Sequence, residues 1–336
     1  METLIYEKLD NKSVTCQICR HFCVIKDGKR GICGVRENRG GTLDSLVYPK
    51  LIASSVDPIE KKPIFHLKPG SSSYSIATVG CNFKCAFCQN ADIAQMPKDH
   101  NGLIQGRDVF PELIVSQAVK AGCDSISYTY TEPTVFFELA FLTARLAKKQ
   151  GLLNVFVTNG YMSAKALDMV SPYLDAANVD LKAFKDSFYK THCKARLEPV
   201  KETIKKMKDM GILVELTTLL IPGLNDDEED LTAMADYIAN DLGPDTPWHI
   251  SRFHPCYHMI DRPSTPVLSL EKAYRTGKAA GLRYVYIGNV LGQSSENTYC
   301  HSCNALLVKR YAYQVDCYLS PGGKCPNCGT AVYGIY

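Results

Sequence analysis

Three cysteines stand close together in the segment TVGCNFKCAFCQN, at Cys81, Cys85 and Cys88. A 4Fe-4S cluster held entirely by cysteine takes four thiolates, so three on one short loop leave one iron free for an outside ligand. The spacing therefore indicates an iron-sulfur site that is open for chemistry. The alternatives are a zinc knuckle or a chance group of thiols, because a short motif gains meaning only from its structural context.

Eight further cysteines form two groups near the chain ends. The C-terminal group consists of two Cys-x2-Cys turns separated by 21 residues, with LLVKRYAY between them as an expected hairpin strand. This spacing is typical of a zinc ribbon, with a rubredoxin-like single iron as the alternative. The N-terminal group supplies four thiolates that fit zinc and an auxiliary 4Fe-4S cluster about equally. The groups are Cys300, Cys303, Cys325 and Cys328, and Cys16, Cys19, Cys23 and Cys33.

The composition favours a large intracellular protein. The chain has 336 residues, of which 46% are hydrophobic and 22% charged, enough for one substantial domain with small attachments. Its 15 cysteines, clustered at short spacings, are more consistent with metal ligands than with disulfides. Neither a signal sequence nor a run of about 18 apolar residues is present, so we expect a cytoplasmic protein with no membrane partner. A net charge of +3 is too small to indicate nucleic acid.

The middle of the chain alternates apolar, β-branched runs with helical patterns. Such repetition predicts a parallel sheet with right-handed crossovers, and six or seven repeats give a (β/α) barrel, complete or partial. A doubly wound open sheet is the competing architecture. We expect an N-terminal four-cysteine module and linker over 1–70, with a hinge at PGSSSYS, a barrel over 71–290 and a zinc-ribbon-like module over 291–336. The predicted strands are SIATV, SISYTY, LLNVFVT, AANVDLK, ILVELTTLL, WHISRF and YVYIG.

Polar residues follow several of these strands, where barrel proteins bind their ligands. Glu132 ends SISYTYTEPT just before a proline that suits a helix start. Asn159 lies in the turn Thr158-Asn159-Gly160, which offers amide and backbone donors. Asp180 and Lys182 are on one face of the same strand.

These residues also have structural interpretations. Glu132 could have a purely structural role at the start of a helix. Asp180 and Lys182 could likewise form a structural ion pair without binding a ligand. His254 in WHISRFHP could contact a ligand or be structural.

The CNFKCAFC loop after the first barrel strand resembles the radical S-adenosylmethionine (radical SAM) superfamily. The resemblance implies a partial (β/α)6-type TIM barrel, a 4Fe-4S cluster held by the three loop cysteines, and SAM bound to the open iron. It also implies that an electron cleaves SAM to a 5′-deoxyadenosyl radical, which abstracts hydrogen. Phe87 is expected to pack against adenine or beneath the cluster.

Later segments resemble the glycyl-radical-enzyme activases of this superfamily. There a Gly-Gly-Glu-Pro motif holds the methionine amino group, where this chain has Tyr130-Thr131-Glu132-Pro133. A backbone edge can serve without glycine if its dihedral angles are ordinary. Val157 replaces the aspartate of their Asp-Thr-Asn-Gly segment, which removes a candidate cation ligand. The Asp-x-Lys pair of those activases lies beside the SAM carboxylate, which implies that role for Asp180 and Lys182.

The order of segments along nearly the whole chain resembles the AmmeMemoRadiSam system radical SAM enzymes. The segments include VDPIEKKPIFHLKPG, RFHPCYHM, YVYIGNV and CPNCG. The resemblance implies genes that lie beside those of Memo-like and AMMECR-type proteins, which are candidate partners. An electron donor such as flavodoxin or ferredoxin is also expected.

Three functions remain open at this stage. The first is hydrogen abstraction from a protein, RNA or small-molecule substrate, as an oxidoreductase-type radical SAM enzyme. The second is activation of a glycyl radical enzyme, with the zinc ribbon as docking element. The third is a non-catalytic metal-binding or electron-transfer protein.

Overall fold

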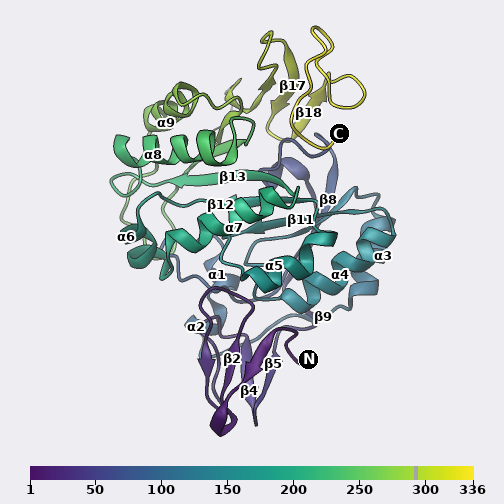
Figure 1. Ribbon diagram of the computed structural model, residues 1–336, viewed down its shortest axis with the longest axis vertical. Coiled ribbons are helices and arrows are strands. Elements are labelled where there is room, and N and C mark those ends of the chain that lie inside the picture. Colours follow the sequence, from purple (N-terminus) through teal and green to yellow (C-terminus); the bar gives the residue numbers. More distant parts are fainter. Residues whose placement is uncertain (291–293) are drawn as a thin grey trace.

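One eight-stranded sheet forms the centre of the computed structural model, which describes residues 1–290 and 294–336 (Figure 1). Its strand order is β15-β14-β13-β12-β11-β10-β8-β7. All neighbouring strands are parallel except β7, which runs antiparallel to β8 at the edge. The strands are β7 (Ala53–Pro58), β8 (Ser72–Ala77), β10 (Ser125–Tyr128), β11 (Leu153–Thr158), β12 (Ala176–Asp180), β13 (Leu213–Leu220), β14 (Trp248–Arg252) and β15 (Val285–Gly288).

The seven predicted strands are all confirmed as parallel members of this sheet. Both faces are covered, and every residue of β10 is buried, which explains why these strands are continuous apolar runs rather than alternating ones. A doubly wound sheet reverses its strand order at one point, and the sequential order here excludes that alternative. Among the described strands, β15 and β7 form two edges that do not pair with each other, so the sheet is open.

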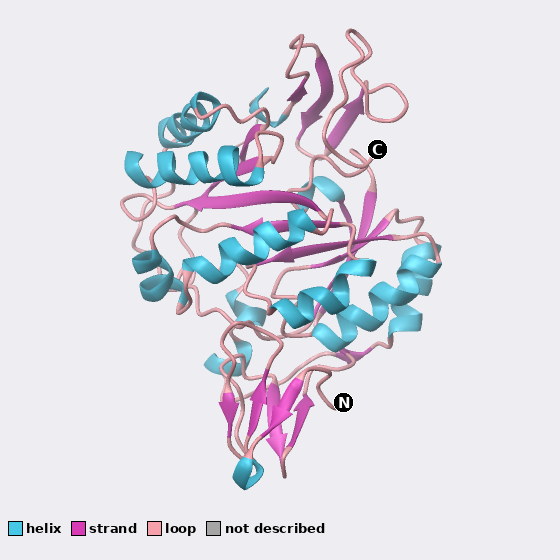
Figure 2. Ribbon diagram, viewed as in Figure 1, coloured by secondary structure: helices cyan, strands magenta, loops and turns pink. Residues whose placement is uncertain are grey.

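Helices connect successive strands and pack beside the sheet (Figure 2). Two of them begin at side-chain caps, where Ser163 accepts from the Ala166 amide and Asp227 from that of Asp230. No helix in the described part of the chain is long and apolar enough to cross a bilayer. The helices are α1 (Ala91–Ala94), α2 (Met96–Asp99), α3 (Pro111–Lys120), α4 (Phe137–Lys149), α5 (Ala164–Val170), α6 (Asp186–Phe188), α7 (Leu197–Asp209), α8 (Glu228–Tyr237) and α9 (Val267–Ala279).

The N-terminal module lies at one end of the long axis (Figure 1). It consists of a three-stranded sheet, β1-β2-β3, and a hairpin, β4-β5. After it, the short strand β6 pairs with β9 from later in the chain. The predicted linker at the end of 1–70 is wrong in part, because residues 53–58 form edge strand β7 of the central sheet, and the predicted hinge segment runs into β8. The strands are β1 (Tyr6–Lys8), β2 (Val14–Cys16), β3 (Val24–Ile25), β4 (Arg36–Arg39), β5 (Thr42–Ser45), β6 (Lys50–Leu51) and β9 (Arg107–Asp108).

The C-terminal module lies at the opposite end (Figure 1). The expected hairpin is confirmed, since β17 (Leu306–Tyr311) pairs with β18 (Gln314–Cys317), and β16 (Thr298–Tyr299) adds a third strand. A small core that includes Phe65, Tyr286 and Val308 joins the module to the sheet. The predicted boundary between 290 and 291 adjoins residues 291–293, which lie outside the described residues.

Candidate active site

The loop that carries Cys81, Cys85 and Cys88 follows strand β8 directly. A Cβ at Gly80 would lie 2.5 Å from Val35 Cγ1, and its φ is +98°, so only glycine fits where the chain turns into the loop. The amide of Lys84 donates to the Cys193 carbonyl at 2.9 Å, which anchors the loop from the other side. These contacts fix the three thiols at the carboxyl edge of the sheet.

Burial determines the protonation of these thiols. It raises the pKa of Cys81 well above its usual value and that of Cys88 to about 12. For Cys85, a hydrogen bond with Cys193 raises the pKa first, and burial adds to it. A thiolate here therefore requires a bound cation, because metal binding is what releases protons from buried thiols.

The three thiols line one cavity of about 300 Å³ together with side chains from the ends of several strands. This arrangement brings together most of the residues predicted from the sequence, namely the three cysteines, Phe87, Asn159, Asp180 and Lys182. It is the geometry of a ligand site at the carboxyl edge of a parallel sheet.

Glu132 supports this cavity without lining it. Its side chain is fully buried and accepts hydrogen bonds from Thr158 Oγ1 at 2.8 Å and from the Asn159 amide at 2.8 Å. Burial raises the pKa of Glu132 despite these bonds. Asn159 in turn points its Nδ2 at Cys81 Sγ, 3.7 Å away. Glu132 therefore positions the turn of Asn159, and its expected direct contact with a ligand is not what the structure shows.

Two other observations concern this segment. The sequence predicts a helix start at Pro133, but residues 133–136 form turns and helix α4 begins at Phe137. The carbonyl of Glu132 accepts from the amide of Val135 in that turn.

Asp180 and Lys182 are adjacent in the cavity, although strand β12 ends at Asp180, so Lys182 follows the strand and does not share it as predicted. Lys182 Nζ lies 3.0 Å from Asp180 Oδ2 and 5.6 Å from the centre of the Phe87 ring. Burial disfavours the charge on Lys182, but the Asp180 carboxylate favours it, and the pKa of Lys182 is raised. The pair therefore presents a charged ammonium next to the three thiols, whatever its role.

Tyr130 is a cavity residue that the sequence reasoning missed. Its φ is +62°, so the dihedral angles at this motif position are not the ordinary ones expected, and glycine would adopt them without strain. Lys62 Nζ lies 4.5 Å from the centre of the Tyr130 ring, and the Tyr130 hydroxyl donates to Asp57. The Tyr130 carbonyl accepts from Asn90 Nδ2 at 2.8 Å. These contacts hold the strained residue at the mouth of the cavity.

His254 does not join the site. It is exposed, its Nδ1 lies 3.2 Å from Ser264 Oγ, and it is absent from the cavity lining. The side chains that do line this edge include Thr217, Ser251 and Asn289, with Asn289 Nδ2 donating to Ser251 Oγ at 2.8 Å. The strand-end rule would have found Asn289, which follows the predicted strand YVYIG, but not Ser251, which lies inside the predicted strand WHISRF.

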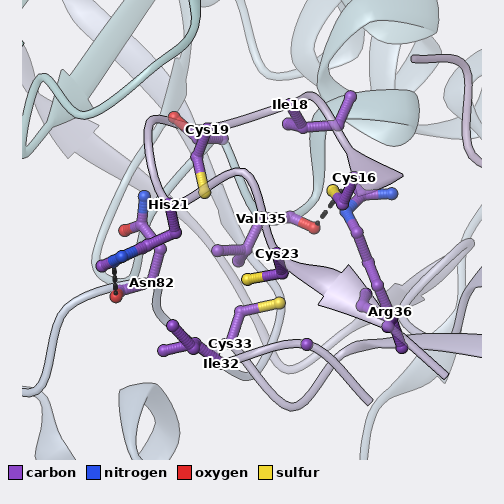
Figure 3. A pocket seen from close by; sticks show the side chains of 13 residues that line it. Cys16, Ile18, Cys19, His21, Cys23, Ile32, Cys33, Arg36, Asn82 and Val135 are labelled. Atoms are coloured by element: carbon purple, nitrogen blue, oxygen red, sulfur yellow. Dashed lines mark hydrogen bonds between the residues drawn. The ribbon is translucent and has the colours of Figure 1, made fainter. Parts of the chain in front are cut away.

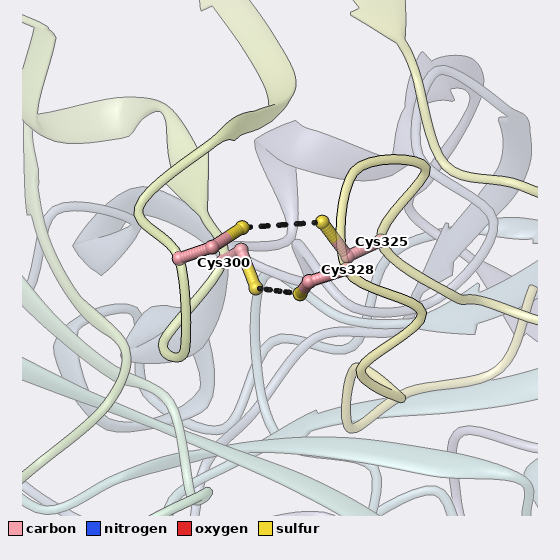
Figure 4. A group of neighbouring side chains, drawn as sticks. Cys300, Cys325 and Cys328 are labelled. Carbon is pink, nitrogen blue, oxygen red and sulfur yellow. Dashed lines mark hydrogen bonds between the residues drawn. The ribbon is translucent and has the colours of Figure 1, made fainter.

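The four C-terminal cysteines form a compact group (Figure 4). Cys300 Sγ lies 3.6 Å from Cys328 Sγ, and Cys303 Sγ lies 3.6 Å from Cys325 Sγ. All four sulfurs lie within 4.8 Å of one another. A neighbouring Thr330 hydroxyl lowers the pKa of Cys328 to about 6. The group is a cysteine cluster that fits one metal ion.

The donor sets decide what each site can hold. Three thiols, with no fourth thiol lining the cavity among the described residues, fit a 4Fe-4S cluster with one open iron, and the adjacent polar residues fit the charged amino and carboxylate groups of SAM. Cys193 lies beside Cys85 but is fully buried away from the cavity lining. The chemistry of the residues therefore matches the group that the loop motif implies.

Comparisons with known proteins agree with this geometry. A family model described as the Radical SAM superfamily matches residues 75–235. An uncharacterized protein of Methanocaldococcus jannaschii is 47% identical over 312 residues, which cover 93% of this chain and 92% of that protein. The pyruvate formate-lyase-activating enzyme of Streptococcus mutans is 22% identical over 165 residues, 47% of this chain and 63% of that enzyme.

Solved structures show the same fold at low identity. The crystal structure of Streptococcus suis SuiB bound to S-adenosylmethionine aligns with a TM-score of 0.52 and 13% identity, over 70% of this chain and 56% of that one. The loop thiols, the cavity at the strand ends, the matched family model and the close relative together lead to one conclusion. The chain contains a radical SAM domain and belongs to the radical SAM superfamily.

Proposed function

We propose that this protein cleaves SAM reductively and uses the resulting radical to abstract hydrogen from a substrate bound at the carboxyl edge of the sheet. The observation that carries the proposal is the set of three loop thiols that line one cavity with Asn159, Asp180 and Lys182. Cys81, Cys85 and Cys88 would hold the 4Fe-4S cluster. When bound, that cluster supplies the electron that splits the sulfonium bond of SAM to give methionine and a 5′-deoxyadenosyl radical.

The protein's own residues bind, orient and shield the reactants. The Asp180 carboxylate suits an amino group and the Lys182 ammonium suits a carboxylate, so the adjacent pair can hold both ends of an amino acid. Phe87 is 3% exposed and packs at 5.7 Å from the ring of Phe188, which gives the cavity an apolar wall. This wall excludes water that would compete for a radical intermediate.

The direct test is anaerobic reconstitution with iron and sulfide, followed by reduction with dithionite and addition of SAM. We expect 5′-deoxyadenosine, detected by liquid chromatography and mass spectrometry. Cys85→Ala should abolish it, whereas Cys123→Ala, a buried cysteine outside the cavity, should retain it. Wild-type protein that holds iron yet forms no more 5′-deoxyadenosine than Cys85→Ala would overturn the proposal in favour of a non-catalytic metal-binding protein.

Activation of a glycyl radical enzyme is the second candidate, favoured by the similarity to a pyruvate formate-lyase-activating enzyme. In this function the substrate hydrogen comes from a glycine on a partner protein whose loop enters the cavity. A glycyl EPR doublet that requires both this protein and the partner would support it. Formation of 5′-deoxyadenosine with a small substrate and no such doublet would favour the first function.

The order of segments along the chain supports a narrower assignment to the AmmeMemoRadiSam system. Memo-like and AMMECR-type proteins are then the partners to test, and a flavodoxin or ferredoxin is the expected electron donor. The cytoplasm is the compartment that fits a protein with fifteen free cysteines. Co-purification of tagged protein with its genomic neighbours under anaerobic conditions would test the assignment, and recovery of none of them would count against it.

A further inference from the structure

The four N-terminal cysteines line a single cavity that the function above does not use (Figure 3). Cys16 ends strand β2, Cys19 and Cys23 lie in the loop before and after the turn at Phe22, and Cys33 precedes strand β4. Figure 3 shows their sulfurs facing a common space. All four thiols are free, and Cys16 is buried while the others are half-buried. The four thiols that line this cavity therefore come from a strand end and two separate loops.

The separation of these sulfurs differs from that of a zinc site. Zinc at 2.3 Å from each sulfur places tetrahedral thiolates about 3.8 Å apart, whereas thiolates on the corners of a 4Fe-4S cube are roughly 6 Å apart. In the part of the chain that the structure describes, the C-terminal quartet alone brings three or more sulfurs within 4.8 Å of one another. The N-terminal sulfurs thus share a cavity at a wider spacing than the C-terminal sulfurs, which favours a cluster over a single zinc ion.

The cavity also contains an unsatisfied polar group. Asn82 is 1% exposed and lines the cavity, and its Nδ2 has no hydrogen-bond partner within the protein. A buried donor without an acceptor costs about 1–3 kcal/mol, so such a group indicates a missing acceptor. The thiolates and sulfides of an iron-sulfur cluster accept hydrogen bonds of this kind, so a metal centre in this cavity would satisfy Asn82.

The same residue connects this cavity to the active site. Asn82 follows Cys81 in the sequence, its main-chain carbonyl lies 2.9 Å from His21 Nε2, and His21 lines the N-terminal cavity. Asn82 Oδ1 accepts from Asn159 Nδ2 at 2.7 Å, and Asn159 lines the active-site cavity. Asn82 therefore contacts Cys81 of the loop group and lines the cavity of the N-terminal group.

We infer that Cys16, Cys19, Cys23 and Cys33 hold a second 4Fe-4S cluster, fully ligated by cysteine, which passes single electrons to the cluster at Cys81, Cys85 and Cys88. In this transfer the N-terminal cluster is oxidised by one electron and the loop cluster is reduced by one, and no bond forms or breaks. A low-potential one-electron carrier, iron-sulfur or flavin in type, then reduces the N-terminal cluster again. The electron-transfer role depends on the proposed function, but the metal assignment does not.

Metal content tests the assignment without any variant. Anaerobically reconstituted full-length protein should contain about eight irons and about one zinc per chain, since two clusters and one C-terminal zinc are expected. About four irons with two zincs would overturn the inference. A Cys81→Ala/Cys85→Ala/Cys88→Ala variant should keep about half of the iron and show an EPR signal after reduction. Cys317→Ala, an exposed cysteine outside all three groups, should match the wild type.

Electron transfer is tested by the rate at which the loop cluster is reduced, followed by freeze-quenched EPR of the signal that changes when SAM binds. With reduced flavodoxin as donor, Cys19→Ala/Cys33→Ala should slow this step by about tenfold or more. Titanium(III) citrate, a small donor, should reduce variant and wild type alike, which also shows that the loop cluster is intact. Equal rates with flavodoxin would overturn the relay. Neither readout requires cleavage of SAM, so either can fail while the proposed function holds.

Discussion

The two cysteine quartets at opposite ends of the molecule share a ligand count and differ in geometry. The C-terminal sulfurs come from two short Cys-x2-Cys turns that face each other, and they approach to 3.6 Å in pairs. The N-terminal sulfurs come from a strand end, a loop and a second loop, and they surround a cavity instead. The backbone that presents the thiols therefore decides how far apart they lie, and this distance is what separates one metal ion from a cluster.

The two modules also differ in the contacts that attach them to the central domain. Arg36 joins the N-terminal module to helix α4 through two bonds of 2.9 Å to the Glu138 carboxylate, and both residues are buried. Arg310 joins the C-terminal module to Glu60 at 3.7 Å, and its Nε has no hydrogen-bond partner. The N-terminal module is tied to the rest of the molecule by a close ion pair, whereas the C-terminal module is held by its small core and by hydrogen bonds to residues 65–68, such as that from Arg310 Nη2 to the Phe65 carbonyl at 2.8 Å.

Removal of a C-terminal ligand should have the largest effect. Cys325→Ala breaks the compact group, and structural zinc contributes about 10–16 kcal/mol to the folding of small metal-binding domains. We expect loss of zinc and rapid hydrogen exchange throughout β17 and β18, while the iron content stays unchanged. Loss of iron together with zinc would show that the two quartets are not independent.

Glu138→Gln should have the next largest effect on stability. It leaves the Arg36 guanidinium buried without its counter-charge, which costs about 3 kcal/mol or more. The matched change Glu60→Gln should cost less, although Arg310 and Glu60 are also buried, because their contact is 3.7 Å long and the Arg310 guanidinium also donates to the Phe65 and Glu296 carbonyls. Urea unfolding and hydrogen exchange of β4 and of β17 measure the two effects. Equal losses would contradict the difference between the attachments.

The central sheet could be predicted from the sequence because its strands are buried on both faces. Strands of this kind appear in the sequence as continuous apolar, β-branched runs. The sequence could not predict edge strand β7, whose segment ASSVDP is mostly polar and partly exposed. For the site, strand ends located Asn159, Asp180 and Lys182, but they also suggested His254, which is exposed. Spacing along the chain gives the end of a strand but not the direction in which a side chain points.

Glu132 illustrates the same limit. Its position at a strand end was correct, but Thr134, Thr158 and Asn159 occupy its carboxylate. Such contacts join residues that are up to 27 positions apart, and no local pattern records them.

Acid should weaken the C-terminal module through His66. Burial first of all lowers its pKa to about 4, and its ring nitrogens contact the Tyr333 carbonyl and the Tyr286 hydroxyl. The unfolded chain binds a proton below about pH 6.5 that the folded chain refuses until about pH 4, so stability falls as pH drops through this window, by about 3 kcal/mol.

Comparison of wild type with His66→Gln isolates this contribution, since the variant cannot titrate there. The difference between them in the unfolding midpoint of the module should change between about pH 6.5 and pH 4 and be constant above that range. His100→Gln, an exposed histidine near the N-terminal module, should leave the pH profile unaltered. A constant difference across the whole range would show that His66 is not the titrating group.

Cys193→Ala should have the smallest effect on stability, and it tests whether the loop group of Cys81, Cys85 and Cys88 has a fourth ligand. Cys193 is fully buried beside Cys85, and as a fourth ligand it would close the loop cluster just as the N-terminal quartet is closed. Because Cys193 does not line the cavity, we expect the variant to keep all of its iron and the EPR change on SAM binding, with a loss of about 1 kcal/mol from the small cavity it leaves. Loss of about half of the iron, as expected for Cys85→Ala, would mean that four thiolates hold the loop cluster. SAM would then have no open iron, and the contrast between an open and a closed cluster would fail.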